Sequence, residues 1–345
     1  MTRETIKALP KAELHRHLDG SIRLRTILEL ARRHGLDLGA RSVQELARQA
    51  TVRAPLRDLQ AVLESFATLQ KVLCSSEAIK RVAFENVEDA HRDGVRLLEL
   101  RFAPPFIAAG KDLDNQEIIE AVLDGITLGM ESYPVEVGLI GILPRGFDLE
   151  VNRKAAEDII RCSRGGHRNA HRICGFDLAD AEDTSDPQDF VPLVEAARRA
   201  GLGITIHSGE NTTAQAVDTT LDLFRPQRIG HGIRIWGHEG TLQRIREQQV
   251  MLELCPTSNW LTRSVPALEE HPLPKLYRSG VEISINSDDP HLFAIDLVHE
   301  YEICSRLYGL SRDQFLDINR RTVEHSFLSP EIRAEVLRNY FSSAG

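Results

Sequence analysis

Short apolar runs alternate with helix-like segments eight times along the chain, and this alternation limits the possible folds more than any other feature. The apolar runs cover residues 13–18, 95–102, 136–143, 172–178, 203–207, 228–232, 250–255 and 281–286. Runs of this length separated by helices are typical of a parallel sheet with helices on its outside. Eight such units in 345 residues predict an α/β fold, a closed (β/α)₈ TIM barrel.

Two regions carry more helix than the barrel connections need. Residues 37–90 have a helical pattern throughout, which we interpret as a helical cover inserted after the first strand, close to the mouth of a site. Residues 294–340 are also helical and predict a set of C-terminal helices. Because no linker or low-complexity segment divides the chain, we expect a single domain over residues 1–345.

An open, doubly wound sheet is the alternative to a barrel. Such a sheet binds a dinucleotide at a glycine-rich turn after its first strand. No Gly-x-Gly-x-x-Gly pattern follows the first apolar run, so the turn that cradles phosphates is missing from the sequence. The barrel is therefore favoured.

Composition excludes several classes of partner. The net charge of −9 disfavours nucleic acid, because polyanions need a basic surface. No apolar run is long enough to span a membrane, and the first residues lack an apolar signal core, so we expect a cytoplasmic protein. The five cysteines are scattered and include no Cys-x-x-Cys pair, which argues against disulfides and thiolate metal sites.

The first strand ends in a His-x-His pair, His15 and His17. Side chains alternate along a strand, so both imidazoles point to the same face, where they could begin a metal site. A pair of ordinary strand-end histidines is an equally good interpretation of this motif alone. Asp19 and Gly20 then end the strand, and Gly20 gives the chain freedom to turn.

Ionisable residues stand at or near the ends of five of the predicted strands, the first, fourth, fifth, sixth and eighth. They are His15, His17, Asp19, Asp177, Asp180, His207, Glu210, His231, Asp288 and Asp289. In a (β/α)₈ barrel the carboxyl ends of the strands form the site, so this sequence predicts a pocket lined by these residues.

Three histidines and a carboxylate suit a divalent transition metal, with zinc as the first choice. A bound metal ion lowers the pKa of water from about 16 to about 7, which favours hydrolysis. Such a reaction also needs a group that receives the proton of water and a group that protonates the leaving side. His231 and Asp288 can serve the first need, and Glu210, three residues beyond His207, can serve the second.

Five motifs in this order resemble the adenosine deaminase family of metal-dependent hydrolases. They are LHRHLDGS at 14–21, HSGE at 207–210, GHG at 230–232, CPTSN at 255–259 and SDDP at 287–290. Each motif alone is weak, but the ordered set is specific and the resemblance runs from Leu9 to about Phe327.

The resemblance implies one Zn²⁺ per chain and a set of catalytic groups. The implied metal ligands are His15, His17, His207 and Asp288. Glu210 would protonate purine N1, His231 would orient the attacking hydroxide, and Asp288 would accept the proton of water. The implied reaction is hydrolytic deamination of a 6-aminopurine nucleoside, with adenosine and 2′-deoxyadenosine first.

The resemblance also implies contacts to the substrate, for which we expect His17, Asp19, Asp180 and Asp289. Asp289, kept protonated by the adjacent carboxylate, would donate a hydrogen bond to purine N7, and Asp19 would bind the ribose 5′-hydroxyl. Residues Leu59, Leu63 and Phe66 would form an apolar lid, although ordinary helix packing explains them as well.

Asp180 and Arg16 are not explained by the family pattern. The family has glycine after the fourth strand, where its amide reaches purine N3, whereas this chain has Asp180, whose side chain could crowd or re-aim the base. Arg16 stands between the two strand-end histidines on the face directed away from the pocket, and we assign it no role.

Other functions stay open at the level of sequence. Free adenine and aminodeoxyfutalosine are alternative substrates, although adenine-specific relatives have glutamate where this chain has Asp19. A two-metal amide or phosphoester hydrolase would need a bridging lysine at the fourth strand, where none lies. A non-catalytic relative should have lost a ligand or the proton donor, and none is lost. The sequence does not indicate the oligomeric state.

Overall fold

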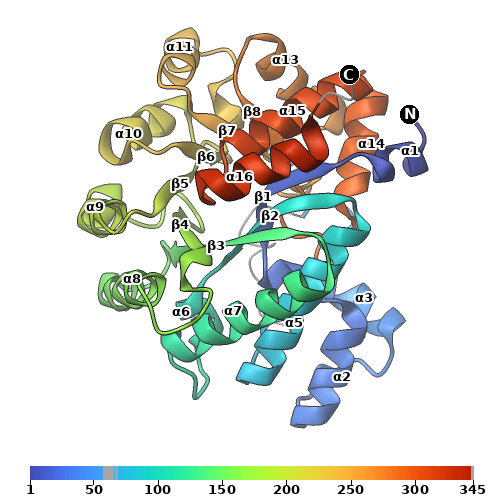
Figure 1. Cartoon of the computed structure of the whole chain (residues 1–345), viewed down its shortest axis with the longest axis vertical. Coiled ribbons are helices and arrows are strands. Elements are labelled where there is room, and N and C mark those ends of the chain that lie inside the picture. The colour runs from blue at the N-terminus through green and yellow to red at the C-terminus, as the bar shows by residue number, and fades with distance from the viewer. Residues whose placement is uncertain (57–65, 67–68, 343–345) are drawn as a thin grey trace.

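A computed structural model describes residues 1–56, 66 and 69–342, and it has the predicted (β/α)₈ architecture. Eight parallel strands lie in the order of the sequence and form a nearly closed barrel, with helices around it (Figure 1). The strands are β1 (Lys11–His17), β2 (Val95–Phe102), β3 (Glu136–Pro144), β4 (Ile173–Ala179), β5 (Gly203–Ser208), β6 (Arg228–His231), β7 (Met251–Leu254) and β8 (Ile283–Ile285).

The barrel closes where the end of β1 meets the segment that follows β8. The amide of His17 donates to the carbonyl of Asp288 at 2.9 Å, and the amide of Asp288 donates to the carbonyl of His15 at 3.0 Å. This pairing fixes the two ends of the sheet against each other at the level of the candidate site.

Helices cover the outer face of the barrel. They are α1 (Arg3–Ala8), α2 (Leu24–His34), α3 (Val43–Ala50), α5 (Ser76–Arg92), α6 (Pro104–Ala108), α7 (Asn115–Ser132), α8 (Leu149–Ser163), α9 (Val191–Arg199), α10 (Ala214–Phe224), α11 (Glu239–Glu247), α12 (Pro256–Leu261), α13 (Leu273–Arg278), α14 (Leu297–Leu307), α15 (Arg312–Glu324) and α16 (Pro330–Val336). Local sequence sets many of their ends: Asp114, for example, accepts the amide of Glu117 at 2.8 Å and starts α7.

Three short helices, α1, α6 and α12, are absent from the sequence-based prediction. Helix α6 begins with Pro104 and Pro105, and proline fits the first turn of a helix because the amides there have no intrahelical partner. Within the predicted helical segment 37–90, residues 57–65, 67 and 68 lie outside the described residues.

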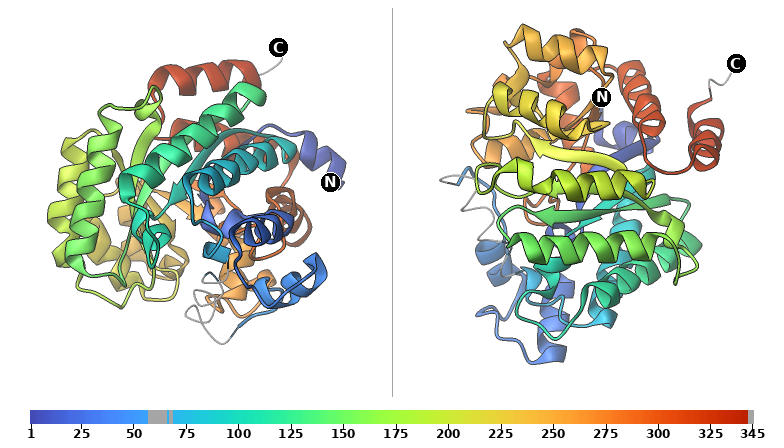
Figure 2. Two further views of the ribbon diagram at one scale, coloured as in Figure 1. Left: turned by 90° about the horizontal axis from the view of Figure 1, so that it is seen from below. Right: turned by 90° about the vertical axis from the view of Figure 1, so that its left-hand side faces the viewer.

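The C-terminal helices lie against one end of the barrel (Figure 2). Val323, Leu328 and Val336 pack there with apolar residues from the amino-terminal halves of strands, such as Ala12 and Leu97. The opposite end, where the strands finish, is thereby left for the site. Among the described residues, no helix is both long and apolar enough to cross a membrane.

Candidate active site

A cavity of about 460 Å³ lies at the carboxyl ends of the strands. Residues at or beyond the ends of all eight strands contribute to its wall: His17, Asp19, Ala103, Pro144, Ala179, Asp180, His207, Glu210, His231, Ser258, Thr262, Asp288 and Asp289. The strand-end residues that the sequence singled out therefore converge on one cavity or lie directly behind it.

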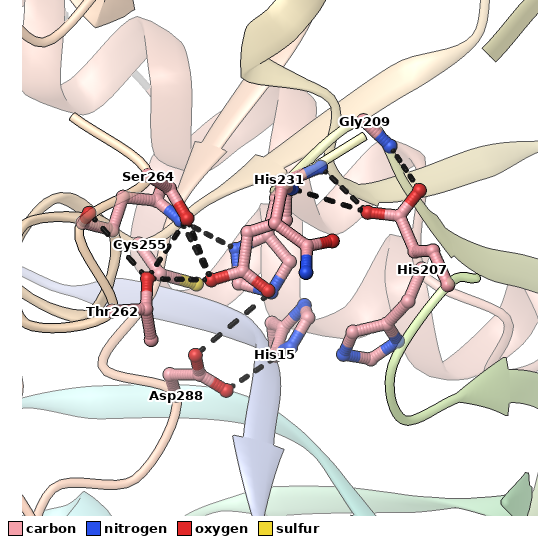
Figure 3. A network of polar contacts seen from close by, with 12 residues as sticks. His15, His207, Gly209, His231, Cys255, Thr262, Ser264 and Asp288 are labelled. Carbon is pink, nitrogen blue, oxygen red and sulfur yellow. Dashed lines mark hydrogen bonds and ion pairs between the residues drawn. The ribbon is translucent and has the colours of Figure 1, made fainter. Parts of the chain in front are cut away.

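The imidazoles of His15, His17 and His207 lie close together beside this cavity, and the Asp288 carboxylate lies next to them. Figure 3 shows His15, His207 and Asp288 of this group. His15 Nε2 lies 3.3 Å from His17 Nε2, and the rings of His15 and His207 are 4.6 Å apart between centroids. Asp288 Oδ1 lies 3.2 Å from His15 Nε2 and 3.3 Å from His17 Nε2. Ligand atoms at these separations can share one metal ion.

Buried carboxylates stand behind two of these rings. His15 Nδ1 donates to Glu253 at 2.9 Å, and His207 Nδ1 lies 3.0 Å from Asp177 Oδ2. A proton held on Nδ1 leaves the Nε2 lone pair free, which is the form that binds a metal. Burial also lowers the pKa of His207 to about 3, so the ring is neutral at physiological pH. The donor set therefore fits a divalent metal.

The Glu210 carboxyl group lines the cavity, with Oε2 3.7 Å from His231 Nε2. Its Oε1 accepts hydrogen bonds from Thr262 Oγ1 at 2.9 Å, from Asn259 Nδ2 at 3.3 Å and from Ser264 Oγ at 3.4 Å. Burial, together with the negative charge of Asp288, raises the pKa of Glu210 to about 7. Because Oε1 already accepts from three donors, the acidic proton belongs on Oε2.

The turn that carries Glu210 is fixed by Glu182. The Glu182 carboxylate accepts the amides of Gly209 at 2.7 Å, Glu210 at 2.9 Å and Asn211 at 3.4 Å. Gly209 has a φ of 71°, which favours glycine at this position. Sequence reasoning did not assign Glu182, and the only available signal was its place just after the fourth strand.

Asp289 and Asp19 share a crowded corner of the cavity. A Cβ built at Gly20 would lie 1.8 Å from Asp289 Oδ1, so this close approach requires glycine. Burial, with the charges of Asp288 and Asp19, raises the pKa of Asp289 well above its usual value. Burial also raises the pKa of Asp19, which accepts a hydrogen bond from the Gln70 amide.

Comparison with known proteins identifies the chain's family. The family model described as adenosine deaminase matches residues 10–340. An adenosine deaminase from Shigella flexneri serotype 5b (strain 8401) is 37% identical over 323 residues, which is 94% of this chain and 95% of the relative. The chain belongs to the adenosine deaminase family. The resemblance seen in the sequence is thus confirmed, and with it a hydrolase acting on C–N bonds of cyclic amidines.

Solved structures of two deaminases have the same fold as this family member. The adenine deaminase from Arthrobacter aurescens gives a TM-score of 0.86 at 27% identity, covering 96% of this chain and 98% of its own. The N6-methyl-AMP deaminase from Arabidopsis thaliana gives a TM-score of 0.84 at 26% identity, covering 99% of each chain.

Asp180 replaces the glycine that the family usually has after the fourth strand, and it adopts a φ of 81°. This left-handed conformation explains why glycine suits the position. The Asp180 carboxylate accepts the amide of Gly146 at 3.1 Å and the amide of Ala181 at 2.8 Å. Asp180 lines the cavity, and its expected contact with the base stays a prediction.

The structure gives Arg16 a contact that the sequence did not suggest. Its side chain is fully buried, with Nη2 at 2.7 Å from Glu13 and 3.5 Å from Asp93. As expected, it is not part of the cavity wall. Of the expected lid residues, Phe66 lines the cavity, whereas Leu59 and Leu63 lie outside the described residues.

Proposed function

We propose that this chain hydrolyses a 6-aminopurine nucleoside, adenosine or 2′-deoxyadenosine, to the 6-oxo nucleoside and ammonia. The observation that carries the proposal is the Glu210 carboxyl, which faces the cavity and titrates near pH 7. At neutral pH a large fraction of this group holds a proton that it can give to purine N1. Protonation of N1 makes C6 more electrophilic.

Asp288 and His231 would act on the water that attacks C6. Against the effect of burial, His15, His17 and His231 hold the pKa of Asp288 well below its usual value, so its carboxylate can receive a proton from water. His231 Nε2 lies 3.9 Å from Asp288 Oδ2 and 3.7 Å from Glu210 Oε2. From there it would stabilise the hydroxide as the hydroxide approaches C6.

Proton transfers then balance the reaction. The hydroxide oxygen bonds to C6 while N1 carries the proton from Glu210. The C6–N bond breaks, and the amino group leaves as ammonia with the proton that Asp288 received. The remaining proton of water, on the new hydroxyl group, returns to Glu210, and its oxygen stays on C6 as the 6-oxo group.

His15, His17, His207 and Asp288 would hold one divalent metal, for which we propose Zn²⁺. The carboxylate-backed rings of His15 and His207 and the short separations within the cluster support this set. When bound, the metal would lower the pKa of a water molecule from about 16 to about 7.

Four residues would contact the substrate around these groups, namely His17, Asp19, Asp180 and Asp289. The raised pKa of Asp289 supports a neutral carboxyl that donates to purine N7. Asp19, two residues beyond the end of β1 and in the cavity wall, would bind the ribose 5′-hydroxyl. We expect a small purine compound as the partner, rather than nucleic acid or a membrane. We also expect the protein to be cytoplasmic.

Free adenine is the second candidate substrate, because the Arthrobacter aurescens structure that resembles this chain is an adenine deaminase. The test is ammonia release, with loss of the aminopurine absorbance, from metal-loaded protein and a panel of adenosine, 2′-deoxyadenosine, adenine and aminodeoxyfutalosine. We expect the two nucleosides to give the highest kcat/KM. A higher kcat/KM for adenine would identify the free base as the substrate. If no compound released ammonia, the proposal would be contradicted.

A further inference from the structure

A chain of three hydrogen bonds ends on His231 and runs through His271 and Asn259, which the proposed reaction does not use. The amide of Leu273 donates to His271 Nδ1 at 3.1 Å. His271 Nε2 lies 3.1 Å from Asn259 Oδ1, and Asn259 Nδ2 lies 3.1 Å from His231 Nδ1. His271, Asn259 and His231 are all buried, so water does not compete for these contacts.

The direction of every bond in this chain follows from its first donor. A backbone amide can only donate, so His271 Nδ1 is an acceptor and the neutral ring carries its proton on Nε2. That proton goes to Asn259 Oδ1, which fixes the orientation of the Asn259 amide. The Asn259 NH₂ group must then donate to His231 Nδ1. His231 is left with a proton on Nε2, the atom that faces the cavity.

We propose that His271 and Asn259 are positioning residues that hold His231 in the Nε2–H tautomer. This role rests on the proposed function, because His231 can stabilise a hydroxide only by donating a hydrogen bond to it. The opposite tautomer would present a lone pair to the negatively charged oxygen, and the two would repel each other.

The group that contacts Nδ1 distinguishes the ligand histidines His15 and His207 from the catalytic histidine, His231. His15 and His207 have carboxylates behind Nδ1, which place the proton on Nδ1 and leave Nε2 free to bind a metal. His231 has an NH₂ donor behind Nδ1, which places the proton on Nε2 and prevents that atom from binding a metal. His231, His15 and Asp288 are close enough to form a second metal-binding group, and the tautomer of His231 excludes it.

Asn259 also joins His231 to the proton donor. Its second amide hydrogen goes to Glu210 Oε1 at 3.3 Å, so one buried side chain touches both groups. Replacement of Asn259 by aspartate removes both donors in nearly the same shape. A carboxylate there would accept from His231 Nδ1 and pull the proton away from Nε2.

The test is ¹⁵N NMR of protein with labelled histidines, with and without bound Zn²⁺, in which His231→Gln assigns the His231 signals. We expect a protonated Nε2 and an unprotonated Nδ1 in the unmodified chain. A protonated Nδ1 would overturn the proposal. This measurement needs no substrate, so it is independent of whether the chain deaminates a purine, and the tautomer itself is measured in the unmodified chain.

Variants then test the link to turnover. Asn259→Asp should transfer the His231 proton to Nδ1 and lower kcat at least tenfold, while Thr262→Val, which removes a contact to Glu210 but lies outside the chain, should leave the tautomer unchanged. His271→Leu should lower kcat with little change in KM, and His271→Gln, which keeps a donor, should restore most of it. An unchanged tautomer in folded Asn259→Asp protein would overturn the proposal.

Discussion

Two buried polar layers lie along the same barrel and meet at Glu253, which contacts Arg228 in one layer and His15 in the other, and they are built differently. At the end covered by the C-terminal helices, Arg228 lies 2.6 Å from Glu99 and 2.7 Å from Glu253. Glu99 also accepts from the Ser326 hydroxyl at 2.6 Å, and the Phe327 ring lies 3.6 Å from the Arg228 guanidinium carbon. Opposite charges there neutralise each other.

The cavity end holds like charges close together. Burial, with the negative charges of Asp288 and Asp19, raises the pKa of Asp289 well above its usual value. The neighbouring histidines hold the pKa of Asp288 well below its usual value, so the two adjacent carboxyl groups differ in charge. His231 and Asp288 also have positive φ values, 64° and 61°, which cost about 1–3 kcal/mol each in residues other than glycine. The paired layer therefore contributes to the free energy of unfolding. The cavity layer instead keeps reactive groups in place, and this lowers the free energy of unfolding.

Glu210→Gln changes the cavity layer, and of the substitutions considered it should have the largest effect on kcat. The amide keeps the shape of the side chain and cannot supply an acidic proton, so kcat should fall by about 10²–10⁴-fold. The bound metal and the melting temperature should change little, since Glu210 is not among the proposed ligands. Steady-state kinetics and metal analysis of the purified variant check this, and normal turnover would remove Glu210 from the role of proton donor.

Glu99→Ala breaks the paired layer and should have the opposite signature. Removing one partner of a buried ion pair costs about 3–5 kcal/mol of unfolding free energy. The kcat of the folded fraction should stay within about threefold, because Glu99 touches no cavity residue. Denaturant unfolding measures the loss, with Glu99→Gln as the control of similar shape. A large fall in kcat without loss of stability would show that the two layers are not separate.

The pH dependence of activity sharpens the comparison, because it reports on one titrating group of the cavity. Glu210 must be protonated to act, and its pKa is raised to about 7. Its protonated fraction is therefore full well below pH 7 and falls about tenfold for each pH unit above it. We expect kcat/KM to decline on the alkaline side accordingly. A flat profile from pH 6 to pH 9 would contradict the assignment.

Asp180→Gly should have the smallest effect. Glycine relieves the positive φ but loses the two hydrogen bonds to the amides of Gly146 and Ala181, so we expect stability to change by no more than about 1 kcal/mol. Substrate preference across the purine panel should shift by less than about tenfold. Identical kinetics for every substrate would show that Asp180 does not influence the base.

The fold could be predicted from the sequence because its elements follow local rules. The strand predicted at 95–102 matches β2, since its apolar residues and the turn residues beside it define it locally. Helix α12 could not be predicted in the same way, because Pro256 to Leu261 has no repeating apolar face and is held by tertiary contacts, including the Thr257 amide on Glu300.

The residues of the candidate site likewise fall into those that local sequence predicts and those that only tertiary contacts reveal. Residues that end strands, such as His207 and Asp288, could be found because a barrel brings strand ends together. Residues that orient them could not, because Glu253 lies in the middle of a strand and His271 in a loop, and neither belongs to a motif. Their roles follow from contacts across more than ten residues of sequence, which no local pattern encodes.

The pairing of β1 with the segment after β8 has a consequence for biosynthesis. Asp288 is synthesised more than 270 residues after His15 and His17. A nascent chain therefore carries an incomplete metal-binding group until its last strand has docked beside its first. Metal uptake into the full cluster should follow synthesis of residue 288, and fragments that end before residue 288 should bind the ion far more weakly.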